Sequence, residues 1–252
     1  MSTQDPSVLE GTGEGFSLNT FLEARVKAQE AVNMIVARVQ VGMLEEDANK
    51  MVVTTLQEMG SNQAFHKPYI RFGTNTVKTF GADSDPGIRL GEDDIFFIDV
   101  GPVWDGYEGD AGDTFLTGNN PEMKRCALDA RAIFQAVAEK WEKEKSTGIE
   151  LYQFAAKRAK YLGWELNLDL GGHRLGDYPS AEHYEGPLSE ISFHPSPNRW
   201  MVEIHIRHPG HLFGAFYEDL LSEPDSSAVR EPEKEQQIAI QQVPMDGVCG
   251  GY

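Results

Sequence analysis

The chain has 252 residues, of which 40% are hydrophobic, and its formal net charge is −18. This size and composition predict one large domain, or two small ones, with a substantial core. The chain has 40 acidic and 22 basic residues, and this acidic balance disfavours nucleic acid and anionic membranes as partners. No stretch approaches the ~20 apolar residues of a membrane span.

The N-terminal stretch and the cysteines bear on the cellular location. Residues 1–16 are polar, with no basic segment followed by an apolar one, so no secretory signal is visible and this stretch is predicted to be disordered. Cys126 and Cys249 are too few for a disulfide framework, and a reducing, cytoplasmic environment is expected. Cys126 falls within a helical pattern and is interpreted as an inert core thiol.

Two helices are predicted before the first strand. Apolar residues recur at helical spacing from residue 18 to about residue 41, where a glycine ends the pattern. A second helix is expected from residue 44 or 45 to residue 59, again followed by a glycine. Residues 69–72, which follow a proline, are typical of a short strand.

A hairpin is predicted within residues 94–115, because Asp105-Gly106 separates two strand-like runs and this dipeptide favours a two-residue turn. With the turn centred there, Gly101 faces Asp110, and Asp99 points to the same side as Asp110. The two carboxylates become diagonal neighbours about 7–8 Å apart at the backbone, and the missing side chain of Gly101 leaves open space between them.

Two interpretations of these carboxylates are open. Two acids that point into one gap repel each other unless a cation lies between them, and a metal ion is a natural occupant. Aspartates near turns also commonly cap the turn, and acidic residues are frequent on the surface of a chain with this net charge. The spacing alone does not decide between a metal site and solvated acids.

The same order of elements follows in the second part of the chain. A long helix is predicted from about residue 119 to residue 145 and a shorter one over residues 151–162, before a strand at 164–170. Two helices followed by strands therefore occur twice, which indicates two similar halves that share one core.

A second hairpin is predicted near the end of this part. Residues 199–207 and 212–221 are strand-like, and Pro209-Gly210 lies between them. A turn centred after Gly210 places Glu203 opposite Glu218, although a shift of one residue would reverse the faces.

Five residues on or beside the predicted strands stand out: Asp99, Asp110, His173, Glu203 and Glu218. Their order resembles that of the pita-bread metallopeptidase family, which includes methionine aminopeptidase, aminopeptidase P, prolidase and the metal-free creatinase. Residues 98–115 resemble the segment that carries the first two ligands. Gly172-His173 with Gly176 resembles the histidine motif, and Tyr217-Glu218-Asp219 resembles the final motif. The resemblance covers roughly residues 17–222.

The resemblance implies an α/β pita-bread fold, with two similar halves, a curved antiparallel sheet around a dinuclear metal site, and helices outside. Residues 17–222 form the catalytic domain in this interpretation, and residues 223–252 form a polar C-terminal tail. The implied cofactors are two divalent ions of the Mn, Co, Zn or Fe type, for which carboxylates and an imidazole are suitable ligands. Asp110 and Glu218 are implied to bridge the ions, with Asp99 on one ion and His173 with Glu203 on the other.

The chain departs from the family pattern at three places. The third position after Asp110, often basic in the family, is Asp113, and the usual Glu-Pro at the fourth ligand is Glu203-Ile204. The family's second histidine, expected shortly after His173, is absent. His183 is the candidate that replaces it in binding substrate and stabilising the intermediate.

Two further histidines are candidate catalytic residues. His66 is expected to line the entrance of the pocket, although a histidine in such a loop is also common without a function. His205 shares the face of Glu203 and is interpreted either as an extra ligand or proton shuttle, or as a hydrogen-bonded core histidine. Arg71 and Arg174 are able to hold a substrate carboxylate, although surface salt bridges are the commoner use of arginine.

The function implied by the resemblance is hydrolysis of a peptide or small amide bond by a metal-activated water, as in an aminopeptidase. A second interpretation uses the same ligands to hold iron for oxygen chemistry on a small substrate. A third is a catalytically inactive binding module, which five intact ligands disfavour. A small molecule or a peptide is the expected partner, without nucleic acid or membrane, and a homodimer is an open expectation.

Overall fold

The computed structural model describes residues 5–223. Its α-helices are α1 (Pro6–Leu9), α2 (Leu18–Val36), α3 (Glu45–Glu58), α4 (Pro121–Glu144) and α5 (Gly148–Leu162). Its strands are β1 (Gln63–Ala64), β2 (Tyr69–Phe72), β3 (Asp94–Val100), β4 (Pro102–Trp104), β5 (Tyr107–Glu108), β6 (Ala111–Thr117), β7 (Glu165–Leu166), β8 (His173–Arg174), β9 (Trp200–Arg207) and β10 (Gly214–Leu220). Three short 3-10 helices lie at Gly73–Val77, Ser180–Glu182 and Leu188–Glu190.

The helix ends follow local capping chemistry. Asn120 accepts hydrogen bonds from the first backbone N–H groups of α4, and Thr147 with Glu150 forms a capping box at the start of α5. Helix α2 ends at Val36, earlier than its apolar pattern predicts. The chain turns there, and Val39 is still buried, so the apolar spacing continues without the helix.

The main sheet joins the two halves of the chain. It has seven antiparallel strands in the order β2-β3-β6-β10-β9-β7, and β8 pairs with β9. The first half supplies β2, β3 and β6, the second half supplies the other strands, and the halves meet where β6 pairs with β10. A second sheet of three short strands has the order β1-β4-β5.

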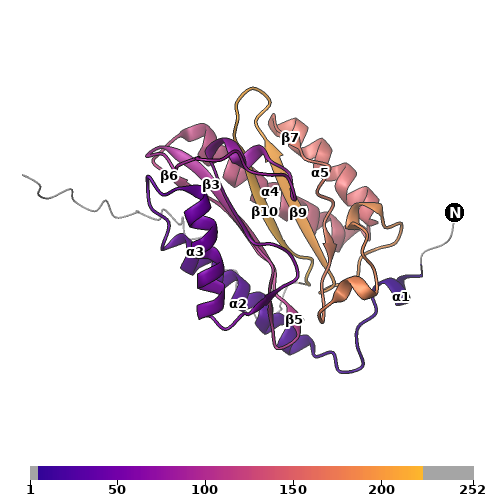
Figure 1. Cartoon of the computed structure of the whole chain (residues 1–252). Coiled ribbons are helices and arrows are strands. Elements are labelled where there is room, and N and C mark those ends of the chain that lie inside the picture. Colours follow the sequence, from indigo (N-terminus) through magenta and orange to yellow (C-terminus); the bar gives the residue numbers. More distant parts are fainter. Residues whose placement is uncertain (1–4, 224–252) are drawn as a thin grey trace, which may run out of the picture.

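Helices cover the outer face of the main sheet. Helix α2 packs against β6 and α3 against β2, whereas α4 packs against β9 and β10 and is itself covered by α5 (Figure 1). The core is accordingly built from two clusters of buried hydrophobic residues, one centred on each half. Cys126 lies fully buried in the second cluster, as predicted.

Both predicted hairpins have the predicted register. Trp104 pairs with Tyr107 across the Asp105-Gly106 turn, in which both residues have a positive φ, 52° and 81°. This is the turn type that an Asp-Gly pair favours. In the second hairpin Glu203 lies opposite Glu218, so both side chains point to the same face of the sheet.

The prediction that the N-terminal segment is disordered was wrong for residues 5–16. Residues 5–16, predicted to be disordered, contain α1 and contact the second half of the chain. The Glu10 carboxylate accepts hydrogen bonds from the backbone N–H of Ser196, 2.8 Å, and from the indole of Trp200, 2.7 Å. The Arg174 guanidinium donates to the carbonyl of Gly11. These buried polar partners hold the segment in place. Residues 1–4, and the predicted tail from residue 224 onward, lie outside the described residues.

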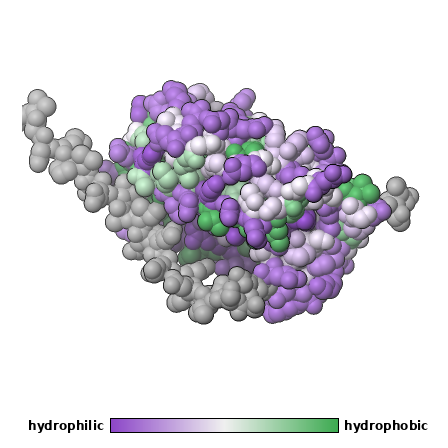
Figure 2. Space-filling view, turned by 90° about the horizontal axis from the view of Figure 1, so that it is seen from below, coloured by the Kyte–Doolittle hydropathy of each residue, from purple (hydrophilic) through white to green (hydrophobic). Residues whose placement is uncertain are grey.

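The strand predicted at residues 164–170 is also shorter than expected. Only β7 is a strand: Asn167 still donates its backbone N–H to the carbonyl of His205, 2.8 Å, and its side-chain amide to Thr79 and His205, at 2.9 Å and 3.1 Å, and the chain turns at residues 168–169. Hydrophobic residues on the face seen in Figure 2 form small separate patches among hydrophilic ones, as is normal for a folded surface. Among the described residues, no helix is long and apolar enough to cross a membrane.

Candidate metal centre

Three of the predicted ligands lie in one row across the inner face of the main sheet. Asp99 on β3 faces Gly112 on β6, Gly112 faces Glu218 on β10, and Glu218 faces Glu203 on β9. A side chain at position 112 would fill this row, since a β-carbon built there lies 2.6 Å from Oε1 of Glu218. The glycine therefore leaves room for whatever the three carboxylates bind.

Asp110 and His173 lie beside this row. Asp110 precedes β6, is 2% exposed, and places its Oδ2 atom 3.0 Å from Nε2 of His173. Although this distance is short, Oδ2 has no hydrogen bond of normal geometry among the described residues. Nδ1 of His173 lies 3.0 Å from the carbonyl of Arg174, to which it donates, so Nε2 is the nitrogen that faces the carboxylates.

His66 approaches Asp110 from the other side in the same way. Its Nδ1 atom lies 3.0 Å from the carbonyl of Lys67, and its Nε2 atom lies 3.4 Å from an oxygen of Asp99 and 3.4 Å from an oxygen of Asp110. A β-carbon at Gly101 would lie 2.2 Å from the His66 ring. The space predicted to be open opposite Asp110 is therefore occupied by this imidazole.

Five of these six residues form two groups of candidate metal ligands, and Glu203 lies outside both groups. His66, Asp99 and Asp110 form one, and Asp110, His173 and Glu218 form the other, with one donor atom of each residue within 4.8 Å of the others in its group. Asp110 belongs to both groups. Oε1 of Glu218 is buried without a hydrogen-bond partner among the described residues, and Oδ2 of Asp110 has only its ion-pair contact with His173. Buried anionic oxygens without donors are strongly unfavourable unless a cation binds them, so the donor set fits a metal.

The pKa values of the candidate ligands are shifted because acids and imidazoles are buried next to one another. Burial lowers the pKa of His66 and of His173, but their contacts with Asp110, together with Asp99 in the case of His66, outweigh it and raise these pKa values to about 9 and about 10. Burial raises the pKa of Asp99 to about 7, with His66 opposing this shift and Asp110 adding to it. Burial and the neighbouring carboxylates raise the pKa of Glu218 well above its usual value.

The other two predicted catalytic residues, His205 and His183, belong to neither group of candidate ligands. His205 is 1% exposed, and both ring nitrogens have partners: Nε2 lies 2.7 Å from the carbonyl of Thr76, and Nδ1 accepts from Asn167. Burial lowers its pKa to about 4, so the ring is neutral. This geometry favours the hydrogen-bonded alternative. His183 lies against Gly11, where a β-carbon would come within 2.8 Å of its Nδ1 atom.

Asp113, which stands where the family often has a basic residue, forms an ion pair in the structure. Asp113 points to the outer face of the sheet and forms a two-point ion pair with Arg131 of α4, at 2.9 Å and 2.7 Å. On the same face, Asp219 of β10 forms a similar pair with Arg25 of α2. Asp113 therefore attaches α4 to the sheet and does not face the ligands.

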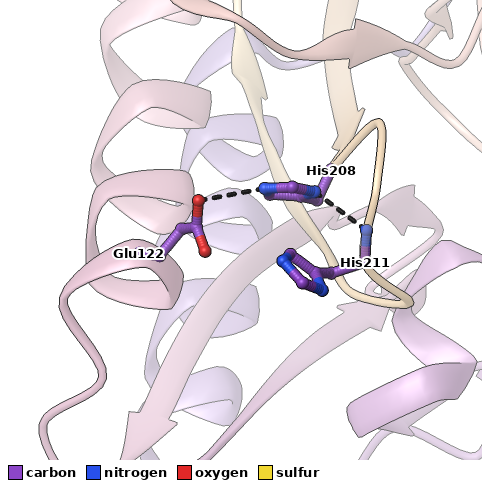
Figure 3. A group of neighbouring side chains, drawn as sticks. All are labelled: Glu122, His208 and His211. Carbon is purple, nitrogen blue, oxygen red and sulfur yellow. Dashed lines mark hydrogen bonds and ion pairs between the residues drawn. The ribbon is translucent and has the colours of Figure 1, made fainter.

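A third group of candidate ligands lies outside the inner face. Glu122 at the start of α4 lies 3.0 Å from Nε2 of His208, and His211 is beside it in the β9–β10 turn (Figure 3). Nδ1 of His208 accepts from the backbone N–H groups of Gly210 and His211, both at 2.9 Å. A neutral ring that accepts at Nδ1 carries its proton on Nε2, which is then a donor to Glu122. His208 therefore stabilises the turn, and its Nε2 atom has no free lone pair for a metal.

Comparisons with known proteins agree with this geometry. The model of metallopeptidase family M24 matches residues 19–220 of the chain. Prolidase from Pyrococcus horikoshii is similar in structure, with a TM-score of 0.65 and 18% sequence identity, over 81% of this chain and 59% of the prolidase. X-Pro aminopeptidase from Thermotoga maritima has a TM-score of 0.66 and 18% identity, over 88% of this chain and 65% of that protein.

A further similar structure is aminopeptidase PepP from Pseudomonas aeruginosa, with a TM-score of 0.60 and 16% identity, over 82% of this chain and 54% of that protein. The chain thus spans between 54% and 65% of the length of these three proteins. No curated protein matches the chain in sequence. At these identities the solved structures establish a shared fold.

Proposed function

Because the chain belongs to metallopeptidase family M24 and has the pita-bread fold, we propose that it hydrolyses a peptide or small amide bond with a metal-activated water. The proteins similar to it in structure are a prolidase and aminopeptidases, which act on peptides. They support the reaction class, and the substrate of this chain is part of the proposal.

We propose Asp99, Asp110, His173, Glu203 and Glu218 as ligands of two divalent ions, with Asp110 and Glu218 shared between them. The observation that carries this proposal is the position of Asp110, which lies within both groups of donor atoms. The ions would supply Lewis acidity, which lowers the pKa of a bound water and polarises the scissile carbonyl. The protein's own contribution is a sheet that fixes three of the carboxylates, Asp99, Glu203 and Glu218, and two backbone carbonyls that orient the histidines.

His66 is the predicted catalytic histidine that contacts this cluster, and we propose it as an additional nitrogen ligand on the Asp99 side. Its Nε2 atom faces Asp99 and Asp110 at 3.4 Å, while its Nδ1 atom is held by a backbone carbonyl. His173 is held and directed in the same way on the opposite side of Asp110. The family pattern has one histidine ligand, so the second one makes this centre richer in nitrogen.

The same observation supports a second candidate function, oxygen chemistry with iron. Two histidines and one carboxylate with open positions are a common ligand set for non-haem Fe(II). In this chain His66 and His173 both contact Asp110, at 3.4 Å and 3.0 Å, but they belong to different donor groups, so this set is divided between two candidate ion positions.

The two functions are separated by metal analysis followed by assays. The full chain would be purified without added metal, its metal content measured by elemental analysis, and the protein reconstituted anaerobically with Mn, Co, Zn or Fe(II). Two ions per chain with amide hydrolysis under Mn or Co would support the hydrolase. Selectivity for Fe(II) with oxygen consumption would support the second candidate, and failure to bind any of these metals would refute both.

A further inference from the structure

Residues 10–17, the N-terminal strap, connect the two halves of the chain. At their C-terminal end they bind the first half: the hydroxyl of Tyr107 on β5 accepts from a backbone N–H of the strap, 2.7 Å, and donates to a strap carbonyl, 3.3 Å. At their N-terminal end Glu10 binds the second half, through Ser196 and Trp200. The strap therefore spans the junction at which the candidate metal centre lies.

The Glu10 carboxylate is the main attachment of the strap. Its Oε1 atom accepts from the backbone N–H of Ser196, 2.8 Å, and from the indole of Trp200, 2.7 Å, and its Oε2 atom accepts from the Ser196 hydroxyl, 2.6 Å. Trp200 is fully buried, so its N–H would lose its acceptor inside the protein if Glu10 moved away, which is costly. The positive charges of Arg174 and Arg199 also attract this carboxylate.

Two glycines bring the strap backbone close to the loop that follows β8. The carbonyl of Gly11 accepts from the Arg174 guanidinium, and the N–H of Gly13 donates to the Asp177 carboxylate, 2.8 Å. A β-carbon at Gly11 would lie 2.8 Å from Nδ1 of His183, and one at Gly13 would lie 2.6 Å from Oδ2 of Asp177. Arg174 and His183, which the sequence analysis considered for binding substrate, therefore both contact the strap.

The strands that the strap binds also contain candidate metal ligands. Arg174 and Trp200 form one pair of the short β8–β9 ladder, and His173 with Met201 forms the other. Glu203 lies three residues after Trp200 on β9. Because side chains alternate along a strand, Arg174 and Trp200 point away from the face that His173 and Glu203 share. The strap therefore holds this ladder on the face that is turned away from the metal centre.

The loop after β8 connects the strap to the Asp110 side of the centre as well. Arg174 donates to the carbonyl of Ser180, 3.1 Å, in addition to its bond with the strap. The backbone N–H groups of Gly176 and Ser180 donate to the carboxylate of Glu108, at 3.2 Å and 2.9 Å. Glu108 is on β5, two residues before Asp110. One guanidinium thus joins the strap to the loop that holds Glu108.

We propose that Glu10 is a positioning residue for the metal centre: it fixes the strap, and the strap holds β8, β9 and β5 in the arrangement that binds metal. The strap and the metal then stabilise the same arrangement, so each strengthens the binding of the other, and linkage makes the two effects equal. This inference rests on the proposed function, because it takes His173, Glu203 and Asp110 as metal ligands.

The test measures both directions of this coupling in the full chain. Calorimetric titration gives the affinity and stoichiometry for Mn(II) and Co(II) in the wild type, Glu10→Gln and Glu10→Lys. Mass spectrometry follows hydrogen exchange of residues 10–17 with and without Mn(II). Glu10→Gln keeps one acceptor oxygen, whereas Glu10→Lys keeps none and is repelled by the neighbouring arginines. The matched control is Thr147→Ala, which lowers stability by removing the capping box of α5, away from the strap.

Glu10→Lys is expected to bind Mn(II) at least about fivefold more weakly than the wild type. The number of ions at saturation should be unchanged, because Glu10 is not itself a ligand. Mn(II) should slow hydrogen exchange of residues 10–17 in the wild type but not in Glu10→Lys, and Glu10→Gln should lie between the two. Thr147→Ala should melt at a lower temperature and still bind Mn(II) as tightly as the wild type.

Two results would overturn the proposal while the wild type binds metal. One is an unchanged Mn(II) affinity in Glu10→Lys, whatever its hydrogen exchange. The other is an equal loss of affinity in Glu10→Lys and Thr147→Ala, which would mean that the loss follows general destabilisation. A wild type that binds neither Mn(II) nor Co(II) would instead refute the proposed function, and this inference would fall with it. The two failures are therefore distinguishable by the titration of the wild type.

Discussion

Glu203 and Glu218 lie directly opposite each other on the paired strands β9 and β10, and each is less than one-tenth exposed. Like charges at directly opposed positions of a sheet destabilise it, and burial strengthens the repulsion. Burial raises the pKa of both carboxyls, so part of the repulsion is relieved by protonation when no cation is present. Folding is therefore expected to be more favourable with a metal than without.

The variant Glu218→Gln tests this relationship. Without metal it should melt at a higher temperature than the wild type, because one of two opposed acids becomes neutral. With metal the order should reverse, since a ligand at 100 times its dissociation constant stabilises the wild type by about 2.7 kcal/mol. Thermal unfolding with and without a chelator measures both. A chelator that leaves the wild-type melting temperature unchanged would contradict the assignment.

The same substitution, Asp→Asn, at two positions three residues apart compares a candidate metal ligand with an acid on the outer face of the sheet. Asp110→Asn should lose metal and activity with little loss of stability, because Asp110 belongs to both donor groups. Asp113→Asn is the matched control: it removes a charge that pairs with Arg131, so metal content should be retained and stability should fall by about 1 kcal/mol or less. Elemental analysis and denaturant titration report the two quantities. Full metal content in Asp110→Asn would show that the ligands are wrongly assigned.

The role of His66 is tested at Gly101 as well as at the histidine itself. Gly101→Ala should expel the imidazole, because the new β-carbon would lie 2.2 Å from the His66 ring. Both Gly101→Ala and His66→Ala should then lower metal affinity, with His208→Ala as a control that removes a turn-stabilising histidine. Calorimetric titration with Mn or Fe(II) gives the affinities. If His66→Ala bound metal as tightly as the wild type, His66 would not be a ligand.

The metal-free protein should become less stable as the pH rises from about 6.5 to about 9. The pKa of His66 is raised from 6.5 to about 9, so the folded state favours the protonated ring, and this contribution is complete below pH 6.5 and lost as the pH passes 9. His173 acts in the same direction up to a pKa of about 10. Melting temperatures after chelation at pH 6.5, 8 and 9.5 measure the effect. His66→Ala should show a weaker dependence, and a wild-type melting temperature that rises with pH would contradict the shift.

The sequence predicted the parts of the site that depend on strand register. The alternation of side chains along a strand, together with an Asp-Gly turn, was sufficient to place Asp99 beside Asp110 and Glu203 opposite Glu218. These relationships are local to a hairpin, so a short stretch of sequence determines them.

The parts that depend on distant segments were not predictable in the same way. His66 reaches Asp110 from a loop, and its imidazole fits there only because Gly101 has no side chain. The sequence analysis interpreted this glycine as leaving the space empty. The ordered structure of residues 5–16 depends on contacts far along the chain, such as the Glu10 carboxylate with Ser196 and Trp200, and the backbone of Gly13 with Asp177. No periodicity reveals contacts of this kind, because each is made once and between parts remote in sequence.

The candidate metal centre lies where the two halves of the chain meet, at the pairing of β6 with β10. His66, Asp99 and Asp110 come from the first half, whereas His173, Glu203 and Glu218 come from the second. A cation bound by both sets is a removable cross-link between distant parts of one polypeptide, and it limits the freedom of the open chain as a covalent staple does. If the chain were divided before α4, neither fragment would hold a complete centre. Reassociation of the two pieces would then depend on metal, and a chelator would separate them.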